Sequence, residues 1–446
     1  AGASPELKPW LSFEDVRRGG PQGRLPAAVV AYMARWKQFK EPTAIQAHCW
    51  PLACAGRDVI GISKTGSGKT FAFVLPGLSR ILKIKSSDSI SFGPYAVVLA
   101  PTRELSTQID KDLKPLCRAL EIKNVCLYGG APKNEQIRSL RDGADVIVAT
   151  PGRLHDFAVN LDKFAGTSIL SLSMVTYVVL DEADCMLDLG FEPQIRRILG
   201  LIGKQRQTLF FSATWPKKVC SLAEEFLRSP ITVRIGSSEA TGATANKDVE
   251  QQVLILEADE TGEANRQAKK EELWRILAEH DGERCLVFCS MKKTAAVLTH
   301  QLRVDGFKAS GLHGDMTQVD RDAAIHAFKA GETKLLVATD VAARGLDVQD
   351  ITAVINYDPA AQVDDHIHRI GRTSRAGKTG VAYTLLGSED VRQAKFVAES
   401  ISNAGQAVPA DLDLLAGRRL ENSKTRKVAN QRARKKLAKK ASAADW

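Results

Sequence analysis

The chain has 446 residues, of which 44% are apolar and 26% charged, an ordinary composition for a soluble globular protein of two or three domains. No apolar run approaches the roughly 20 residues that a membrane-spanning helix requires, so we expect no membrane partner. The net charge of +10 is uneven, because residues 418–446 hold eleven Lys and Arg against two acids. The rest of the chain is therefore close to neutral, and the basic character belongs to the C-terminal end.

Short β-branched runs alternate with helical patterns from about residue 25 to 235. Such alternation predicts a parallel sheet that is covered by helices on both faces. We place this first α/β domain at 39–235 and treat 1–38 as an N-terminal flank. Its strands are predicted at 58–62, 95–100, 124–128, 144–149, 174–181, 207–212 and 231–235.

A second α/β domain is predicted at 250–401, after a small, polar, aperiodic linker at 236–249. From Ser402 the alternation ends, which predicts a basic tail over 402–446 that belongs to neither core. The strands of the second domain are predicted at 252–256, 284–289, 308–312, 334–338, 352–356 and 379–385.

A glycine-rich loop lies between the first strand and a helical pattern that runs from Phe71 to Leu82. Backbone N–H groups of such a loop cradle a polyphosphate, a lysine contacts the β- and γ-phosphates, and a hydroxyl reaches Mg²⁺. A Gly/Ser-rich turn is the structural alternative for this loop alone. The candidate nucleotide residues are Ser63, Lys64, Thr65, Gly66, Ser67, Gly68, Lys69 and Thr70.

A second candidate site follows the apolar run that begins at Val179, where Asp181 and Glu182 are adjacent carboxylates. At the end of a neighbouring parallel strand, one carboxylate can hold Mg²⁺ and the next can orient a water molecule. Together with the phosphate loop, this pair predicts nucleotide hydrolysis.

Polar, non-packing residues also follow other strands of the first domain. Backbone amides, hydroxyls and arginines at one sheet edge suit a sugar–phosphate backbone and offer no base-reading set. Any one of these loops alone could equally be a turn or a helix cap. The candidates for contact with such a backbone are Pro101, Thr102, Arg103, Gly129, Gly130, Thr150, Pro151 and Arg153.

The second domain contributes two further segments, Thr339–Asp347 and His368–Arg375. Arg372 and Arg375 are three residues apart, so on a helix they would share a face. Two arginines delivered to a γ-phosphate would act as arginine fingers. The alternative is a solvated basic turn.

Cysteine and histidine usage argues against a metal centre or a disulfide framework. The eight cysteines are scattered without a Cys-x-x-Cys pair, which favours a reducing compartment. Cys285 and Cys289 would share one strand face as small core residues. His366 and His368 have no partnering Cys/His cluster, so metal ligation there is disfavoured.

In this order and spacing, the motifs over roughly residues 10–400 resemble those of DEAD-box RNA helicases of superfamily 2. The resemblance implies two tandem RecA-like domains that use ATP and Mg²⁺ and bind single-stranded or duplex RNA through its backbone. Phe39, Thr43 and Gln46 would form the adenine site, where a carboxamide can both donate and accept hydrogen bonds. Asp181 would bind Mg²⁺ through water, and Glu182 would position the attacking water.

The resemblance also assigns residues of the second domain and of the link between hydrolysis and RNA binding. Gln318, Arg321 and Thr339 would contact RNA, while Gly345 and Asp347 would lie near the nucleotide. Arg372 and Arg375 would stabilise the transition state with Lys69. Ser212, Thr214, Asp184 and His368 would couple hydrolysis to the RNA-bound state. The sequence departs from the family pattern at Ser63, Ser374 and His366, where Ala, Gly and Tyr are usual.

A finer resemblance concerns the branch of nuclear and nucleolar helicases that assemble ribosomes, carried by 187–195, 212–216 and 42–76. It implies a monomer in the nucleus or nucleolus, otherwise in the cytoplasm, that works on pre-ribosomal particles with an activating protein. One alternative is an ATP-dependent RNA clamp, an assembly factor with little turnover. The other, a DNA translocase, is disfavoured by the adenine motif and the Asp-Glu-Ala-Asp run.

Overall fold

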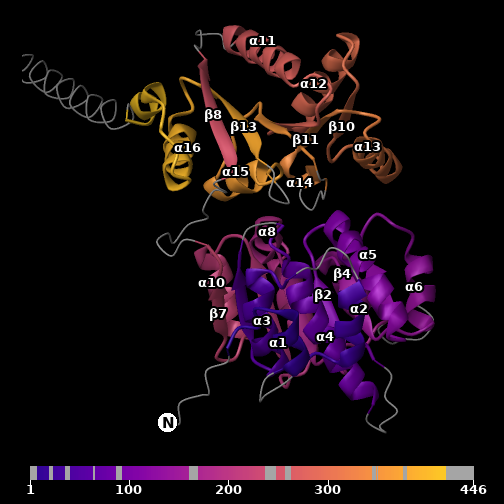
Figure 1. The fold of residues 1–446 in the computed structure, drawn as a ribbon. Helices are drawn as coiled ribbons and strands as arrows, with labels where there is room; N and C mark the ends of the chain where they lie inside the picture. The colour runs from indigo at the N-terminus through magenta and orange to yellow at the C-terminus, as the bar shows by residue number, and fades with distance from the viewer. Residues whose placement is uncertain are drawn as a thin grey trace, which may run out of the picture. The chain divides into compact units, whose positions relative to one another are not determined.

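The structure is a computed structural model that describes residues 8–19, 24–35, 41–63, 66–86, 93–159, 169–236, 248–256, 263–343, 348, 350–374 and 379–417. The chain divides into two compact units, shown in Figure 1. Unit 1 comprises Ala1–Ala243 with Ala343–Asp347, and unit 2 comprises Thr244–Ala342 with Val348–Trp446. Within these described ranges, no helix has the length and apolar character needed to cross a bilayer.

Unit 1 contains a seven-stranded sheet with the order β3-β4-β2-β5-β6-β1-β7, and all of its strand pairs are parallel. Every strand predicted for the first domain is confirmed, with ends that shift by up to three residues. The strands are β1 (Val59–Ile62), β2 (Ala96–Leu99), β3 (Asn124–Leu127), β4 (Val146–Ala149), β5 (Tyr177–Asp181), β6 (Gln207–Ser212) and β7 (Ile231–Arg234).

Helices cover both faces of this sheet, because successive strand residues point to opposite sides. Val98 packs into one core with α3, α4 and α5, while Val97 packs into the other with α7, α8, α9 and α10. The helices are α1 (Phe13–Arg18), α2 (Ala27–Arg35), α3 (Ala44–Cys54), α4 (Lys69–Lys85), α5 (Arg103–Ala119), α6 (Lys133–Arg141), α7 (Pro151–Val159), α8 (Ala183–Asp188), α9 (Glu192–Leu201) and α10 (Lys217–Phe226).

The predicted flank at 1–38 requires a correction, because its described part belongs to the first core. Trp10, Val16, Val29 and Met33 are buried among residues of α3 and α4. The backbone N–H of Trp10 also donates to the carbonyl of Ala47, at 2.9 Å. The apolar residues of α1 and α2 recur at helical spacing, so they complete one face of the domain instead of preceding it.

Unit 2 contains a six-stranded, all-parallel sheet with the order β10-β11-β9-β12-β13-β8. The strands are β8 (Val249–Leu256), β9 (Cys285–Cys289), β10 (Ala309–Leu312), β11 (Leu335–Thr339), β12 (Ala353–Asn356) and β13 (Gly380–Gly387). The helices are α11 (Glu263–Glu279), α12 (Lys292–Val304), α13 (Gln318–Ala330), α14 (Asp340–Ala343), α15 (Val363–Ile370) and α16 (Val391–Asn403). Cys285 and Cys289 are buried in its core, as predicted.

Two predicted boundaries of unit 2 are wrong. Strand β8 begins at Val249, inside the predicted linker, and pairs with β13 along its whole length. The predicted tail also begins too early, because residues 410–417 are helical and Leu412 and Leu415 are buried against α16 and β8. These leucines are three apart and so share one face of the helix. The strongly basic stretch at 418–446 and most of the linker lie outside the described residues.

Candidate nucleotide and RNA sites

The predicted phosphate loop connects the end of β1 to the start of α4. Gly66 and Gly68 have φ values of 76° and 91°, in the left-handed region that glycine adopts most readily. A Cβ at Gly68 would lie 2.6 Å from Nε2 of Gln46 and 3.0 Å from Oγ1 of Thr43. The backbone therefore forms a cradle that a side chain at this position would fill. Lys64 and Thr65 lie outside the described residues.

Gln46 connects the start of α3 to this loop. Its Oε1 accepts from the Thr43 N–H at 3.1 Å, and its Nε2 donates to the Gly68 carbonyl at 3.0 Å. Thr43 and Gln46 thus have the spacing of a capping box, which was not predicted although the signal is local. The role of Gln46 toward adenine stays a prediction, and Phe39 lies outside the described residues.

Lys69 begins α4 and is buried at the floor of the loop, where its Nζ donates to the Ser63 carbonyl at 2.7 Å. The Ser63 and Ser67 hydroxyls lie 2.8 Å apart. Burial raises the pKa of the Asp181 carboxyl to about 7, and the positive charge of Lys69 partly offsets that effect. The loop on β1 and the carboxylate on β5 are therefore close enough to interact.

Asp181 is the last residue of β5, and Glu182 precedes α8 with φ 51° and ψ 52°. A left-handed backbone costs a residue with a side chain about 1–2 kcal/mol, and such conformations concentrate at functional sites. The Glu182 N–H donates to Oδ1 of Asp181 at 3.1 Å. The Asp181 carboxylate and the Thr70 hydroxyl supply oxygen ligands of the kind that Mg²⁺ takes.

No group of three or more His, Cys, Asp or Glu able to hold a metal occurs among the described residues. Mg²⁺ is commonly held by one or two carboxylates together with substrate phosphates. Asp181 and Thr70 therefore fit an ion that binds together with a nucleotide.

The residues of unit 1 that were predicted to couple hydrolysis to RNA binding lie close together. Oδ2 of Asp184 accepts from the backbone N–H of Thr214 at 2.9 Å and from its hydroxyl at 2.6 Å. Oγ of Ser212 accepts from the Asp184 N–H at 3.4 Å. All three residues are buried, so a buried hydrogen-bond network joins the end of β6 to the start of α8.

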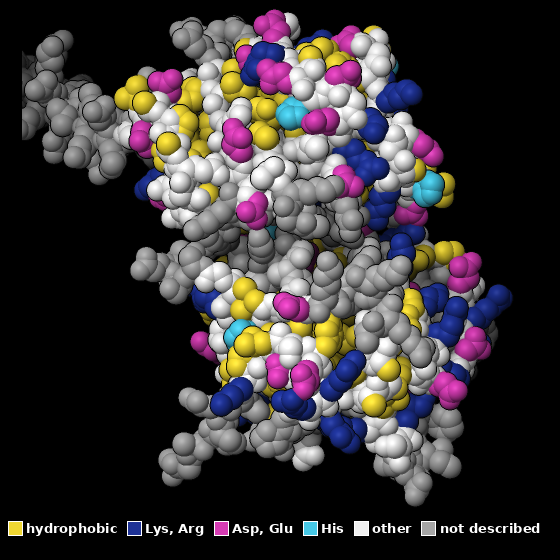
Figure 2. Space-filling model, viewed as in Figure 1, with side chains coloured by type: hydrophobic (Ala, Val, Ile, Leu, Met, Phe, Trp, Pro, Cys, Tyr) yellow, Lys and Arg dark blue, Asp and Glu magenta, His cyan; other side chains and the backbone are white. Residues whose placement is uncertain are grey.

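The candidate RNA loops follow β2, β3 and β4, which are neighbours in the sheet, so their carboxyl ends meet at one edge. The Arg103 guanidinium lies 4.7 Å from the centre of the Tyr128 ring, which connects the first two loops. Oγ1 of Thr102 accepts from the Leu105 N–H at 3.2 Å, so this residue also caps α5. Figure 2 shows Lys and Arg side chains gathered over the α5–α6 part of unit 1.

Arg153 lies one turn into α7, beside the loop that contains Gly129 and Gly130. Its Nη2 donates to the Ala131 carbonyl at 3.1 Å, while its Nη1 is buried without a hydrogen-bond partner. Burial lowers its pKa. Thr150 and Pro151 are buried, and Pro151 is the first residue of α7. A guanidinium with an unsatisfied donor beside two exposed glycines suits an anionic ligand.

In unit 2, Gln318 begins α13 and its Oε1 accepts from Nη1 of Arg321 at 3.4 Å. Thr339 ends β11 at the same edge of the sheet as the C-terminal end of β12. The structure thus groups Gln318 with Arg321, whereas Gly345 and Asp347 lie outside the described residues.

Arg372 does not lie on a helix, so the helix face that it would share with Arg375 is not formed. Helix α15 ends at Ile370, and Arg372 lies in the turn that follows Gly371, where it is 5% exposed. Ser374 has φ 57°, the conformation that glycine adopts without strain, which explains why glycine suits this position. His368 lies in the last turn of α15, and Arg375 lies outside the described residues.

Arg369 is a central residue for which no role was predicted. It is 2% exposed, and its guanidinium binds the Asp340 carboxylate, the Asn356 side chain at 3.3 Å and the Asp358 carbonyl at 2.7 Å. It also lies 5.1 Å from the Phe288 ring centre. The sequence does contain a signal for it, an arginine on the apolar side of a short helix and next to the predicted arginine fingers.

Comparison with known proteins adds family membership to this geometry. Residues 43–222 match the model of the DEAD/DEAH box helicase, and residues 268–377 match the helicase conserved C-terminal domain. DEAD-box ATP-dependent RNA helicase 20 of Arabidopsis thaliana is 43% identical over 408 residues, which cover 91% of this chain and 76% of the relative. Helicase 14 of the same plant is 44% identical over 85% of this chain and 58% of its own length.

Solved structures of other proteins have a similar fold. S. cerevisiae Dbp5 bound to RNA and ADP BeF3 is similar with a TM-score of 0.72 and 28% identity, over 89% of this chain and 94% of that one. Mss116p bound to ssRNA and AMP-PNP is similar with a TM-score of 0.75 and 26% identity, over 92% of this chain and 80% of that one. This chain spans 48–65% of the length of three plant relatives. On the match to helicase 20 and the two matching domain models, the chain belongs to the family of DEAD-box ATP-dependent RNA helicases.

Proposed function

We propose that this chain is an RNA-dependent ATPase that uses ATP to bind RNA, separate short duplexes and remodel RNA–protein particles. The observation that carries the proposal is the sheet edge of unit 1. There the phosphate cradle at Gly68, the buried pair Lys69 and Asp181, and the arginine with an unsatisfied donor, Arg153, all follow the carboxyl ends of parallel strands.

Each residue of the nucleotide site has a chemical role in this proposal. The loop amides and Lys69 would bind the phosphates of ATP, and Thr70 and Asp181 would hold Mg²⁺. The ion would supply charge neutralisation at the phosphates. Glu182, which directly follows Asp181 on a left-handed backbone, would orient and deprotonate the attacking water. Arg372 and Arg375 would stabilise the charge of the transition state.

RNA would bind at the loops after β2, β3 and β4 and at Gln318, Arg321 and Thr339 of unit 2. Contacts to phosphates and sugars carry no base information, so sequence specificity would be low. The 2′-hydroxyl would supply the preference for RNA over DNA. The support from relatives is that Dbp5 and Mss116p, which are similar to this chain, have been solved with RNA and ATP analogues.

The experiment that tests the proposal is steady-state ATP turnover with RNA, with DNA of the same sequence and without nucleic acid. We expect turnover to rise with RNA only. Stimulation by DNA to the same extent would favour a translocase. ATP-dependent RNA binding without turnover would favour the RNA clamp, and an absence of both would contradict the proposal.

For the finer role, we propose ribosome assembly in the nucleolus, with an activating protein and pre-ribosomal particles as partners. The support is the resemblance at 187–195 and 212–216, and one similar structure is of Dbp5 bound to Gle1. Fluorescence localisation and co-sedimentation with pre-ribosomal particles test this role. A cytoplasmic protein that sediments away from such particles would contradict it.

A further inference from the structure

His366 is a buried histidine in α15 that the proposed reaction does not use. It is 1% exposed, and its Nε2 lies 3.1 Å from Oε1 of Gln251 in β8. Its ring lies 6.0 Å from that of Phe396 in α16. Burial, with a contribution from Arg369, lowers its pKa to about 3, so the imidazole is neutral at physiological pH. The contact is therefore a hydrogen bond between neutral groups.

Gln251 joins this histidine to a second helix. Its Oε1 also lies 3.1 Å from Oγ of Ser400 in α16, so one carbonyl oxygen serves α15 and α16. Nε2 of Gln251 and Nδ1 of His366 are buried without a hydrogen-bond partner. Removing one member of a buried polar network leaves its partners without hydrogen bonds. Each buried group that loses its partner costs about 1–3 kcal/mol of stability.

Gln406 connects the same network to the segment that follows α16. Its Oε1 accepts from the Gln251 N–H at 2.9 Å, and its Nε2 donates to the Val249 carbonyl at 2.6 Å. Strand β8 is the outermost strand of the sheet, beside β13 (Figure 1). The amide of Gln406 therefore bonds to the open edge of β8 at Val249 and Gln251, as the peptide group of another strand would.

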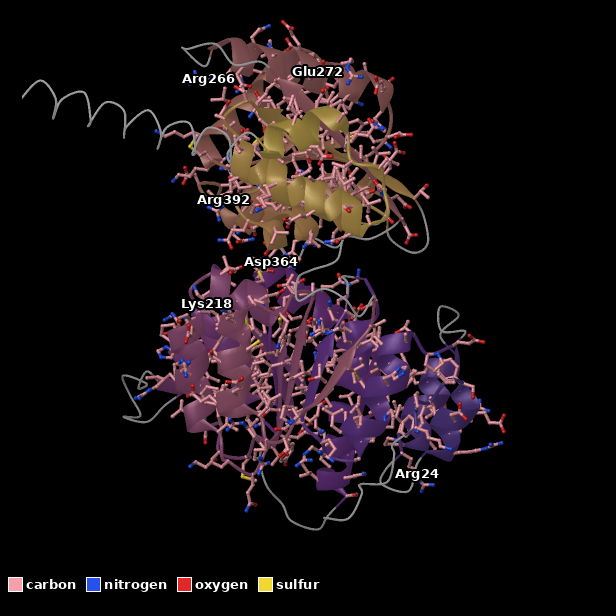
Figure 3. All side chains as sticks on the ribbon, turned by 90° about the vertical axis from the view of Figure 1, so that its left-hand side faces the viewer. Arg24, Lys218, Arg266, Glu272, Asp364 and Arg392 are labelled. Carbon is pink, nitrogen blue, oxygen red and sulfur yellow. The ribbon has the colours of Figure 1, made fainter. Side chains whose placement is uncertain are left out.

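Helix α15 is thus held at two places. Arg369 fixes it to Asp340, Asn356 and Asp358 at the ends of β11 and β12, and His366 fixes it to β8. Arg372 lies two residues after the last residue of this helix, so its position depends on the orientation of α15. Asp364 near the start of α15 and Arg392 near the start of α16 are labelled in Figure 3.

We propose that Gln251, His366 and Gln406 are positioning residues for ATP turnover: through them, strand β8 and the segment at 404–417 set the orientation of α15 and hence of Arg372. The inference rests on the proposed ATPase function, because Arg372 acts there on the nucleotide. It gives the segment after α16 a role in catalysis without any contact to substrate.

Hydrogen–deuterium exchange of the full chain tests the positioning without reference to activity. Gln251→Met keeps the side-chain volume and removes the shared oxygen. We expect backbone exchange in residues 366–372 to speed up about three- to tenfold, the effect of one lost hydrogen bond. Gln252→Met is the matched control, because Gln252 is the next residue of β8, is exposed, and donates to Glu250 on the same strand. Unchanged exchange in Gln251→Met would overturn the proposal, whatever the ATPase activity.

Kinetics test the consequence, with Gln406→Ala as a milder variant that removes no core side chain. The turnover number with saturating RNA should fall about three- to tenfold, while the KM for ATP stays within twofold, since the nucleotide residues of unit 1 are untouched. Equal falls in Gln252→Met, or full turnover in both Gln251→Met and Gln406→Ala, would contradict the proposal. A wild-type chain without ATPase activity would instead contradict the proposed function and leave the exchange result to decide this inference.

Discussion

The two units assemble their functional residues in different ways. In the phosphate loop of unit 1 the hydrogen-bond partners are close in sequence, such as Lys69 with Ser63, 6 residues apart, and Gln46 with Gly68, 22 residues apart. In unit 2 the contacts that join α15 to β8 connect distant segments, with 115 residues between His366 and Gln251 and 155 between Gln251 and Gln406. A short motif therefore describes the phosphate loop, whereas the contact of α15 with β8 depends on how the whole sheet is built.

The comparison predicts two kinds of failure when residues are changed. Substitutions in unit 1 should abolish a chemical step or a binding contact while the fold survives. Substitutions around α15 should lower the stability of unit 2, and ATP turnover should fall in proportion to the stability that is lost. The following predictions run from the largest expected effect to the smallest.

The largest effect is expected for Glu182→Gln, which keeps the shape of the side chain but removes its negative charge. ATP turnover should fall at least about a hundredfold, the usual loss for a missing general base. RNA binding in the presence of ATP should persist, because no phosphate or RNA contact is removed. Glu224→Gln, at an exposed position of α10, is the control and should leave turnover unchanged. Near-normal turnover in Glu182→Gln would remove the role given to this carboxylate.

Gly68→Ala should abolish tight ATP binding. The new Cβ would meet Nε2 of Gln46 at 2.6 Å on a backbone with φ 91°. Strain of a left-handed backbone costs about 1–2 kcal/mol, and the clash adds to it by pushing Gln46 away from the loop. Equilibrium binding of a fluorescent ATP analogue should weaken at least about tenfold. Gly56→Ala, with φ 77° and nothing within 4 Å of the added Cβ, carries only the strain and should bind normally.

Arg369→Lys tests the buried contacts that fix α15 to the ends of β11 and β12 in unit 2. Lysine keeps the charge but cannot form the two-pronged bond to Asp340 together with the contacts to Asn356 and Asp358. We expect a loss of about 2–3 kcal/mol in the unfolding free energy, measured by denaturant titration. Arg275→Lys, where the arginine is 47% exposed beside Glu272 and Glu279, should change stability by less than about 0.5 kcal/mol. Equal effects in the two variants would contradict the structural role given to the buried Arg369.

The same contrast explains how much of the molecule could be predicted. Buried parallel strands are continuous apolar runs, and each one was predicted from the sequence. The start of β8 was missed because Glu250 and Gln251 are polar, although Gln251 is 9% exposed. The buried glutamine is explained by partners more than 100 residues away, which a local pattern does not contain.

Local chemistry also led to wrong predictions where a short signal competed with packing. The spacing of Arg372 and Arg375 suggested a helix face, yet Gly371 ends α15 one residue earlier. The charge-rich end of the chain suggested a tail from Ser402, yet Leu412 and Leu415 supply enough apolar surface to cover β8. The phosphate loop, in contrast, was predictable, because the loop backbone requires positive φ angles at Gly66 and Gly68, which is a local property of the sequence.

The smallest effect expected is a pH dependence that comes from His366. Burial lowers its pKa from 6.5 to about 3, so between these values the unfolded chain binds a proton that the folded chain does not. The stabilising contribution is therefore complete above pH 6.5 and is lost as the pH falls, by at most about 1.4 kcal/mol per pH unit. The groups that face the ring are the charged Arg369 and the neutral Gln251 and Phe396.

His366→Gln isolates this dependence, since the amide nitrogen of glutamine can take the place of Nε2 in the bond to Gln251 but does not titrate. Denaturant unfolding at about pH 7.5, 6.5 and 5.5 should show wild type losing about 1 kcal/mol more than the variant over the lower step. His326→Gln, at an exposed position of α13, is the control and should retain the wild-type slope. Parallel curves for wild type and His366→Gln would mean that the imidazole is protonated in the fold. The hydrogen bond to Gln251 would then involve a charged imidazole, which would contradict the neutral contact between α15 and β8.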